Sequence, residues 1–354
     1  MKTSGKVVAG VASSALLLSM AGMAVAAPGS NDKALEGATH DVNGNEIDSH
    51  SITVDEKAFT EVANKQGEFT FNQLGTTPND DLFNVFGTAI TSMCSKPAND
   101  MVTEVAKASA NYYINIGGDM QEAFSINLAE MEDESEEMTM ACSCATGAPF
   151  GQANVIGVPL KAVVGMANLE DGVNTLTAYG VDGFGVPMPL QYALDHDAML
   201  VYSVNGEKLA SEYGPSAQIW MPETVARYFT RNICDIKLTK EDVVPGVQTV
   251  DPMYRNKIEI MNNADACVFL SGYDITFEGV ADDLGSAISA IEFSFDNGKT
   301  WTTCDVADAT ADKWVNWQFT TSFEEAGDYK LLVRACTQDG VVSPLEASLN
   351  FSIV

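Results

Sequence analysis

The chain has 354 residues, 46% of them hydrophobic and 19% charged, which is enough for two domains with full cores. It carries 49 acidic and 19 basic residues, so its formal net charge is −30. A field of that sign repels nucleic acid and anionic lipid surfaces, which argues against both as partners. The three histidines, His40, His50 and His196, are scattered along the sequence. Their spacing argues against a histidine-based metal site and against a Ser-His-Asp triad.

The N-terminus has the pattern of a secretory signal peptide. Lys2 and Lys6 frame the start of an apolar run over residues 7–23, and a small-x-small cleavage site follows at residues 24–26. We therefore predict a signal peptide over residues 1–26 and an extracytoplasmic mature protein, secreted or held in the cell envelope. Residues 27–55, rich in Gly, Asn, Asp and Ser, predict a flexible leader. No later run approaches the roughly 18 apolar residues of a spanning helix, so no membrane span is expected.

Residues 56–245 combine short alternating segments with a few helical patterns, which predicts an α+β domain with a mixed sheet. Strands are predicted at residues 111–118, 124–128, 138–142, 176–180, 186–190, 199–204, 218–222 and 233–238. Helices are predicted at residues 160–166, 192–195 and 223–232. The last of these would carry Arg227 and Arg231 four apart on one face.

A linker over residues 246–263 is followed by a purely β pattern over residues 264–354. Strands are predicted near residues 267–270, 273–278, 290–295, 300–305, 314–320, 330–335 and 347–354. Seven short strands at this spacing predict an immunoglobulin-like sandwich. A disulfide between Cys304 and Cys336 is compatible with the pattern, although the sequence does not fix the connectivity.

Two of the seven cysteines, Cys142 and Cys144, follow the predicted strand 138–142 in a turn of small residues. An odd number of cysteines outside the cytoplasm leaves at least one unpaired. A thiolate at the end of a strand, above a slim loop, suits a soft or transition metal. The simpler interpretation is a buried or disulfide-bonded structural thiol.

Several blocks, taken in order, resemble the sulfite oxidase family of molybdopterin-dependent oxidoreductases. In the first domain they are residues 113–120, 139–142, 157–160, 182–184 and 198–209. In the C-terminal part they are residues 291–301, Trp314, Trp317, residues 327–329 and residues 334–335. The resemblance covers about residues 75–354, from a cofactor domain to an immunoglobulin-like dimerisation domain.

The resemblance implies a molybdenum-molybdopterin cofactor with Cys142 as the catalytic thiolate on the metal. Arg227 and Arg231 stand where the family places basic groups against the pterin phosphate, a task suited to the planar guanidinium group. The implied chemistry is a two-electron transfer that moves an oxygen atom to or from a small substrate, followed by electron transfer with a redox partner. The family architecture also implies a homodimer formed through the C-terminal domain.

The sequence departs from the family pattern at residues 84–87, Asn-Val-Phe-Gly, where the family has Arg-Asn-His. The signal peptide also lacks the paired arginines used to export proteins already folded around a cofactor. Two functions therefore stay open. One is an exported, divergent molybdopterin-dependent oxidoreductase. The other is a cofactor-free extracytoplasmic binding or accessory protein that keeps the fold, in which Arg227 and Arg231 form surface ion pairs with Glu223 or Asp235.

Overall fold

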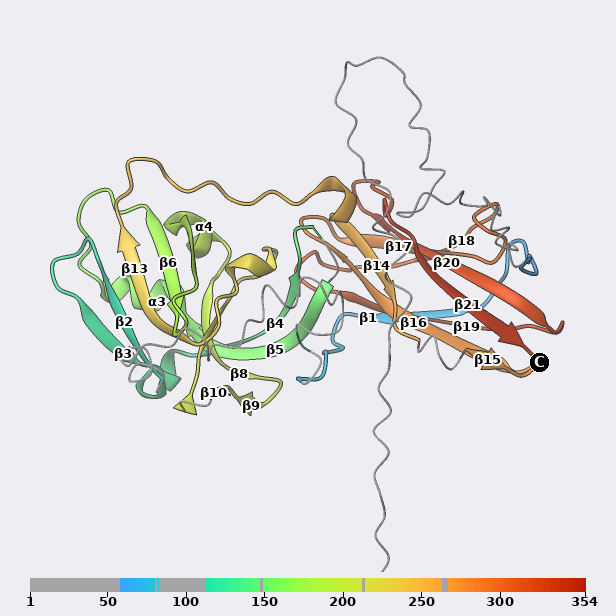
Figure 1. Ribbon diagram of the computed structural model, residues 1–354, viewed down its shortest axis with the longest axis horizontal. Helices are drawn as coiled ribbons and strands as arrows, with labels where there is room; N and C mark the ends of the chain where they lie inside the picture. Colours follow the sequence, from blue (N-terminus) through green and yellow to red (C-terminus); the bar gives the residue numbers. More distant parts are fainter. Residues whose placement is uncertain (1–57, 80–81, 83–111, 147–148, 212–213, 263–266) are drawn as a thin grey trace, which may run out of the picture. The chain divides into compact units, whose positions relative to one another are not determined.

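A computed structural model describes residues 58–79, 82, 112–146, 149–211, 214–262 and 267–354, and all of these belong to one compact unit that begins at Lys57. The predicted signal peptide and leader, Cys94 and the block 84–87 lie outside the described residues. The described chain is mostly β-sheet with few helices (Figure 1), so the α+β expectation holds only approximately.

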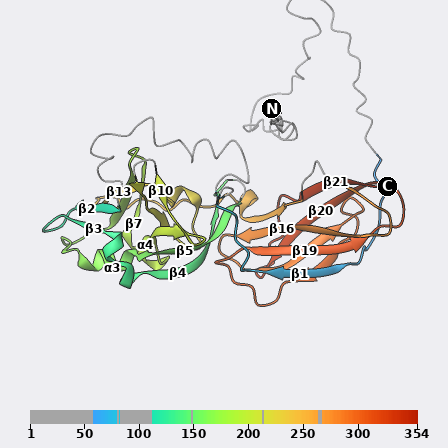
Figure 2. The same cartoon turned by 90° about the horizontal axis from the view of Figure 1, so that it is seen from below.

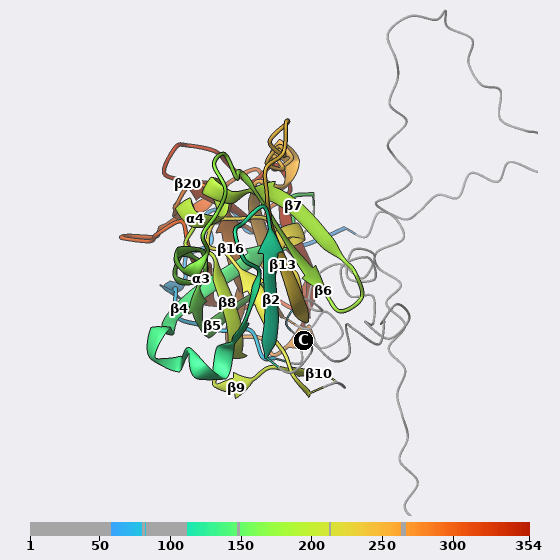
Figure 3. The same ribbon diagram turned by 90° about the vertical axis from the view of Figure 1, so that its left-hand side faces the viewer.

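The first sheet has the strand order β3-β2-β13-β6-β7. Its strands are β2 (Tyr113–Gly118), β3 (Phe124–Asn127), β6 (Thr175–Gly180), β7 (Gly185–Pro189) and β13 (Ile233–Thr239). Strand β13 pairs in parallel with β2 and antiparallel with β6, so the sheet is mixed as predicted (Figure 3). Gly118 ends β2 at a φ of 113°, and a Cβ there would lie 2.1 Å from the Leu238 carbonyl oxygen, so only glycine fits.

The second sheet has the order β12-β8-β5-β4 and carries the cysteine strand at its edge. Its strands are β4 (Glu136–Ser143), β5 (Pro149–Pro159), β8 (Met199–Val204) and β12 (Gln218–Trp220), with β9 (Glu207–Lys208) paired to β8. Helices α3 (Leu160–Met166) and α4 (Leu190–Asp195) begin directly after β5 and β7, each behind a proline. One apolar core joins both sheets and both helices, and includes Ile116, Val158, Leu160, Leu190 and Leu200.

Short elements complete this part of the chain. They are the 3-10 turns η2 (Leu128–Glu130), η3 (Glu132–Glu134), η4 (Ala226–Tyr228) and η5 (Pro252–Tyr254), and the paired strands β10 (Ala210–Ser211) and β11 (Gly214–Pro215). Among the described residues, no helix is long and apolar enough to cross a membrane.

The C-terminal part contains two sheets that share one aromatic-rich core. The first sheet has the order β1-β19-β16-β14 (Figure 2) and consists of β1 (Glu68–Asn72), β14 (Asn256–Ile260), β16 (Asp274–Asp283) and β19 (Val315–Ser322). The second has the order β15-β21-β20-β17-β18 and consists of β15 (Val268–Phe269), β17 (Ile288–Ser294), β18 (Thr302–Asp305), β20 (Gly327–Thr337) and β21 (Ala347–Ile353). A strand lies at each of the seven C-terminal positions predicted from the sequence.

Two strands join this C-terminal sheet from segments that the sequence analysis placed elsewhere. Strand β1, within the predicted domain 56–245, pairs with β19, and β14, within the predicted linker 246–263, pairs with β16. Strand β5 was not among the predicted strands, because its small and amide residues have little β-propensity. Its central place between β4 and β8 outweighs that preference.

One local prediction is wrong, and one pairing that the sequence left open is not observed. The predicted helix 223–232 is a single 3-10 turn at Ala226–Tyr228, because Asn232 has a φ of 49° and Arg231 bridges to Gln218 as a short strand contact. The disulfide between Cys304 and Cys336 is absent, and both thiols are free. Strand β17 lies between β18 and β20, so the two cysteines are separated by about twice the strand spacing of roughly 4.8 Å, too far for a disulfide.

Glu259 on β14 gives the stability of this part of the chain a pH dependence. Burial raises the pKa of its carboxyl group from 4.5 to about 7. The native state therefore holds the proton more tightly than the unfolded state, and stability falls as pH rises from about 4.5 to about 7. Glu259→Gln should flatten the pH dependence of the unfolding free energy by roughly 1–3 kcal/mol over that interval. Glu68→Gln on the exposed face of β1 is the control, and equal pH profiles for Glu259→Gln and the parent protein would contradict the assignment.

Candidate functional site

The cysteine strand β4 sends alternate side chains to two different environments. Met140 and Cys142 enter an apolar cluster, and Cys142 is 0% exposed there. Ala141 packs instead against Val280 and Trp314, on the face toward β16 and β19. This is the alternation that a strand imposes on successive residues. The Cys142 side chain is therefore fully buried among apolar neighbours.

Leu82 covers the sheet beside Cys142. Cys142 pairs with Gly151 of β5, and a Cβ at residue 151 would lie 2.4 Å from the Cδ2 atom of Leu82. The absence of a side chain at Gly151 thus makes the space that Leu82 occupies. Leu82 and Cys142 belong to the same apolar cluster.

The chain segment that leads to Leu82 is fixed to β5 by Gln152. The backbone N–H of Thr77 donates to the Gln152 carbonyl at 2.7 Å, and the Thr77 hydroxyl accepts from the Gln152 N–H at 3.1 Å. The fully buried Gln152 amide also donates to the Gly75 carbonyl at 2.7 Å and accepts from the Trp314 N–H at 2.7 Å. One side chain thereby satisfies polar groups of the 75–79 segment and of the segment before β19.

Asn205, in the turn after β8, fixes the same segment from its other side. Its amide donates to the Thr77 carbonyl at 2.9 Å and to the Asn79 side chain at 2.8 Å. Its side-chain oxygen accepts from the Asn154 N–H at 3.0 Å. Asn205 has a φ of 49° and precedes Gly206 at 79°, the conformation that the Asn-Gly sequence predicts for a tight hairpin turn.

A pocket of about 450 Å³ opens between this segment, the end of β8 and β12. Two cationic side chains, Lys208 and Arg231, and one acidic side chain, Glu207, contribute to its lining together with Asn79, and Lys208 also pairs with Glu132 at 3.4 Å. Leu82, Val204 and Trp220 also line it and at the same time belong to the apolar cluster that holds Cys142. A pocket with two cations and one carboxylate in its lining, called here the basic pocket, therefore shares its wall with the cluster around the buried thiol. Its guanidinium and ammonium groups attract an anionic group such as a phosphate.

The structure separates the two arginines chosen from the sequence. Arg231 is half-buried and lines the pocket. Arg227 is exposed on η4, with its guanidinium 5.9 Å from the centre of the Tyr228 ring. The same apolar residues therefore lie between Cys142 on one side and the pocket of Arg231 on the other, whereas Arg227 does not line the pocket.

Three residues of this region were not chosen from the sequence. Lys208 lies in the block 198–209 that resembles the family, but it was given no role of its own. Its position two residues after the Asn205-Gly206 turn is the signal that could have placed it at the end of a hairpin. Gln152 and Asn205 gave no signal as individual side chains, because their roles depend on contacts with residues 51 to 162 positions away in the sequence.

Other thiols of the described chain have a raised pKa. Burial raises the pKa of Cys234 to about 11 and that of Cys304 to about 11, with a smaller contribution in each case from the adjacent aspartate. Both stay protonated at neutral pH, whereas a metal needs the thiolate. Among the described residues, no three His, Cys, Asp or Glu side chains converge as a ligand set.

Comparison with known proteins identifies the central part of the chain. Residues 101–246 match the family model described as an oxidoreductase molybdopterin binding domain. The sulfane dehydrogenase SoxCD from Paracoccus pantotrophus has a similar structure at 19% identity and a TM-score of 0.55, over 66% of this chain and 69% of that chain. The fibronectin(III)-like modules of Clostridium thermocellum CbhA match at 10% identity and a TM-score of 0.23, over 62% of this chain and 93% of that chain. No curated protein sequence matches the chain.

The family match covers β2 to β13, which includes the cysteine strand, both helices and the pocket residues on β8, β9 and β12, whereas Asn79 and Leu82 lie outside it. The likeness to SoxCD extends the shared fold to two thirds of the chain. Residues 101–246 therefore match an oxidoreductase molybdopterin binding domain, in agreement with the sequence blocks that resemble the sulfite oxidase family, and the chain shares a fold with SoxCD.

Proposed function

We propose that this chain is an exported molybdopterin-dependent oxidoreductase that carries out a two-electron oxygen-atom transfer on a small substrate. The observation that carries the proposal is the basic pocket of Lys208 and Arg231, whose wall of Leu82, Val204 and Trp220 also encloses Cys142. The pattern of the first 26 residues supports export, and the family match supports the cofactor class.

The residues present fit the cofactor at its anionic end. Arg231 and Lys208 would hold the pterin phosphate through their guanidinium and ammonium groups, and Lys208 would exchange its ion pair with Glu132 for one with the phosphate. Cys142 would supply the thiolate to molybdenum, which carries the redox chemistry when it is bound. The sulfur is 0% exposed in this structure, so Leu82 has to move aside before Cys142 can act as a ligand.

The chain itself would position the residues of the pocket wall and exclude water from the pocket. Gln152 and Asn205 hold the 75–79 segment against β5 and β8, which keeps Asn79 and Leu82 at the pocket wall. Trp220 and Val204 form an apolar wall, and such a wall lowers the local dielectric and strengthens the attraction between the cations and a bound anion. The electron acceptor would be a separate redox partner.

One observation favours the second function, a cofactor-free extracytoplasmic binding or accessory protein. Cys142 lies among Met140, Ala153, Val155 and Leu82, an apolar environment of the kind in which structural cysteines pack. In that case the pocket would take a small anionic ligand, and Cys142 would serve only as packing. Metal content separates the two functions.

Native protein from a host that makes the cofactor should contain about one molybdenum per chain. Cys142→Ser should reduce the molybdenum content severalfold or more, because serine is a harder ligand than thiolate. Cys144→Ser is the matched control, two residues away and half-buried, and should keep the metal. Elemental analysis measures all three. A native protein without molybdenum would favour the binding protein, and equal losses from the two variants would contradict the specific role of Cys142.

Arg231→Gln should weaken retention of the cofactor on dialysis by about tenfold or more, the effect of one charge-assisted hydrogen bond. Arg227→Gln provides the comparison, because Arg227 is exposed and lies outside the pocket lining. Molybdenum and phosphate retained per chain after serial dialysis give the measurement. Equal losses from the two variants would contradict the assignment of this pocket as the phosphate site.

We also propose a homodimer formed through the C-terminal sheets. Val268, Leu270, Tyr273 and Val354 are each more than half exposed around the edge strand β15. Sedimentation at micromolar concentration should give twice the chain mass, and Leu270→Glu should shift the protein to monomer. A monomeric native protein would contradict this proposal.

A further inference from the structure

The face of β4 opposite to Cys142 is attached to the C-terminal sheet through buried polar groups. The Ser143 hydroxyl donates to the Asp282 carboxylate, and both residues are almost completely buried, at 1% and 3% exposed. Asp282 lies on β16, directly opposite Lys257 of β14 in the strand register. Ala141, two residues before Ser143, packs on Val280, two residues before Asp282.

The hydrogen bond between Ser143 and Asp282 forms part of a buried charged group that includes Lys257. Burial raises the pKa of Asp282. The positive charge of Lys257 is the largest effect that lowers it, and the hydrogen bonds from Ser143 and Trp314 are smaller effects in the same direction. Burial lowers the pKa of Lys257, and the charge of Asp282 is the largest effect in the opposite direction. A buried carboxylate needs both a counter-charge and hydrogen-bond donors, and Ser143 is one of the donors.

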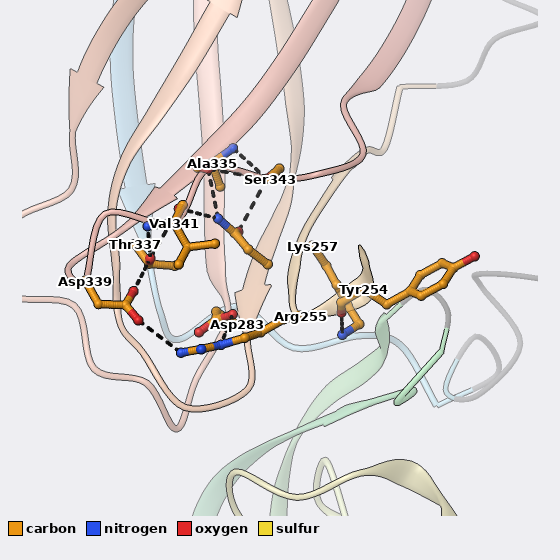
Figure 4. Close-up of polar contacts among 10 residues, drawn as sticks. Tyr254, Arg255, Lys257, Asp283, Ala335, Thr337, Asp339, Val341 and Ser343 are labelled. Atoms are coloured by element: carbon orange, nitrogen blue, oxygen red, sulfur yellow. Dashed lines mark hydrogen bonds and ion pairs between the residues drawn. The ribbon is translucent and has the colours of Figure 1, made fainter. Parts of the chain in front are cut away.

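The segment around Lys257 is itself held firmly (Figure 4). Lys257 donates to the Tyr254 carbonyl, and Arg255 lies between Asp283 at 3.3 Å and Asp339 at 3.2 Å. Between them in the sequence, the Asn256 amide donates to the carbonyls of Ala335 and Val341, both at 2.9 Å. The start of β14 is therefore anchored to both C-terminal sheets, and Lys257 has a fixed place beside Asp282.

We propose that Asp282 is a positioning residue for Cys142, acting through Ser143. Because neighbouring residues of a strand face opposite ways, anchoring the Ser143 side chain on Asp282 keeps Cys142 turned into its cluster. A backbone bond from the Asp251 N–H to the Ala145 carbonyl at 3.0 Å supports the same turn two residues further on. The C-terminal sheet thus sets the orientation of the candidate ligand.

The catalytic meaning of this positioning rests on the proposed function, but its test does not need the cofactor. Native protein is pulsed with iodoacetamide, and alkylation of Cys142 is followed by mass mapping. Ser143→Ala should speed the labelling of Cys142 on the order of ten- to hundredfold, the factor expected for loss of one hydrogen bond to a charged group. Thermal unfolding is recorded in parallel.

Ser294→Ala is the matched control, because Ser294 is also 1% exposed and its hydroxyl donates to the Asp296 carboxylate at 2.8 Å, away from β4. It should lose comparable stability without faster labelling of Cys142. If Ser143→Ala and Ser294→Ala change the labelling in proportion to their loss of stability, Ser143 has only a structural role and the inference is overturned.

A second variant, Asp282→Leu with Lys257→Met, removes the acceptor and both charges together, so that no unpaired charge is left buried. It should label Cys142 as fast as Ser143→Ala does, and labelling at the native rate would overturn the inference. Faster labelling in a protein that holds no molybdenum would keep the inference and reject the proposed function. If molybdenum is bound through Cys142 but Ser143→Ala leaves the labelling of the metal-free protein unchanged, the proposed function is kept and the inference is rejected.

Discussion

Strand alternation at the end of β4 is the constraint on which the candidate site depends. Two neighbouring residues, Cys142 and Ser143, face opposite ways, one into an apolar cluster and the other onto a buried carboxylate. The cluster provides a wall shared with a basic pocket, and the carboxylate belongs to the C-terminal sheet. A rotation of this strand would move the thiol and break the hydrogen bond together, so the two environments reinforce one orientation.

Much of the fold could be predicted because it depends on local patterns. The alternation in β2, β6, β8 and β13, and the helix at Leu160–Met166, follow directly from the spacing of apolar residues. The elements that sequence reasoning missed depend on partners far away in the chain. Strand β1 pairs with β19 almost 250 residues later, and β5 is a central strand in spite of its small and amide residues.

The site could be predicted only in part for the same reason. The frame around Cys142 was visible as a sequence block, and residues 101–246 match the corresponding domain family. The pairing of Arg227 with Arg231 failed because it assumed a helix, and the chain instead makes one 3-10 turn and then a bridge to Gln218. Lys208, which lines the pocket with Arg231, comes from a different hairpin and could be found only from the three-dimensional arrangement.

The central claim is that the Cys142 sulfur binds molybdenum in the native protein. X-ray absorption at the molybdenum edge counts the sulfur atoms around the metal and tests this claim most directly. We predict that molybdenum in Cys142→Ser has one sulfur ligand fewer than in the native protein, or that this variant loses the metal. Molybdenum in Cys144→Ser should keep the native number of sulfur ligands. A sulfur shell that is unchanged in Cys142→Ser, or a native protein without molybdenum, would contradict it.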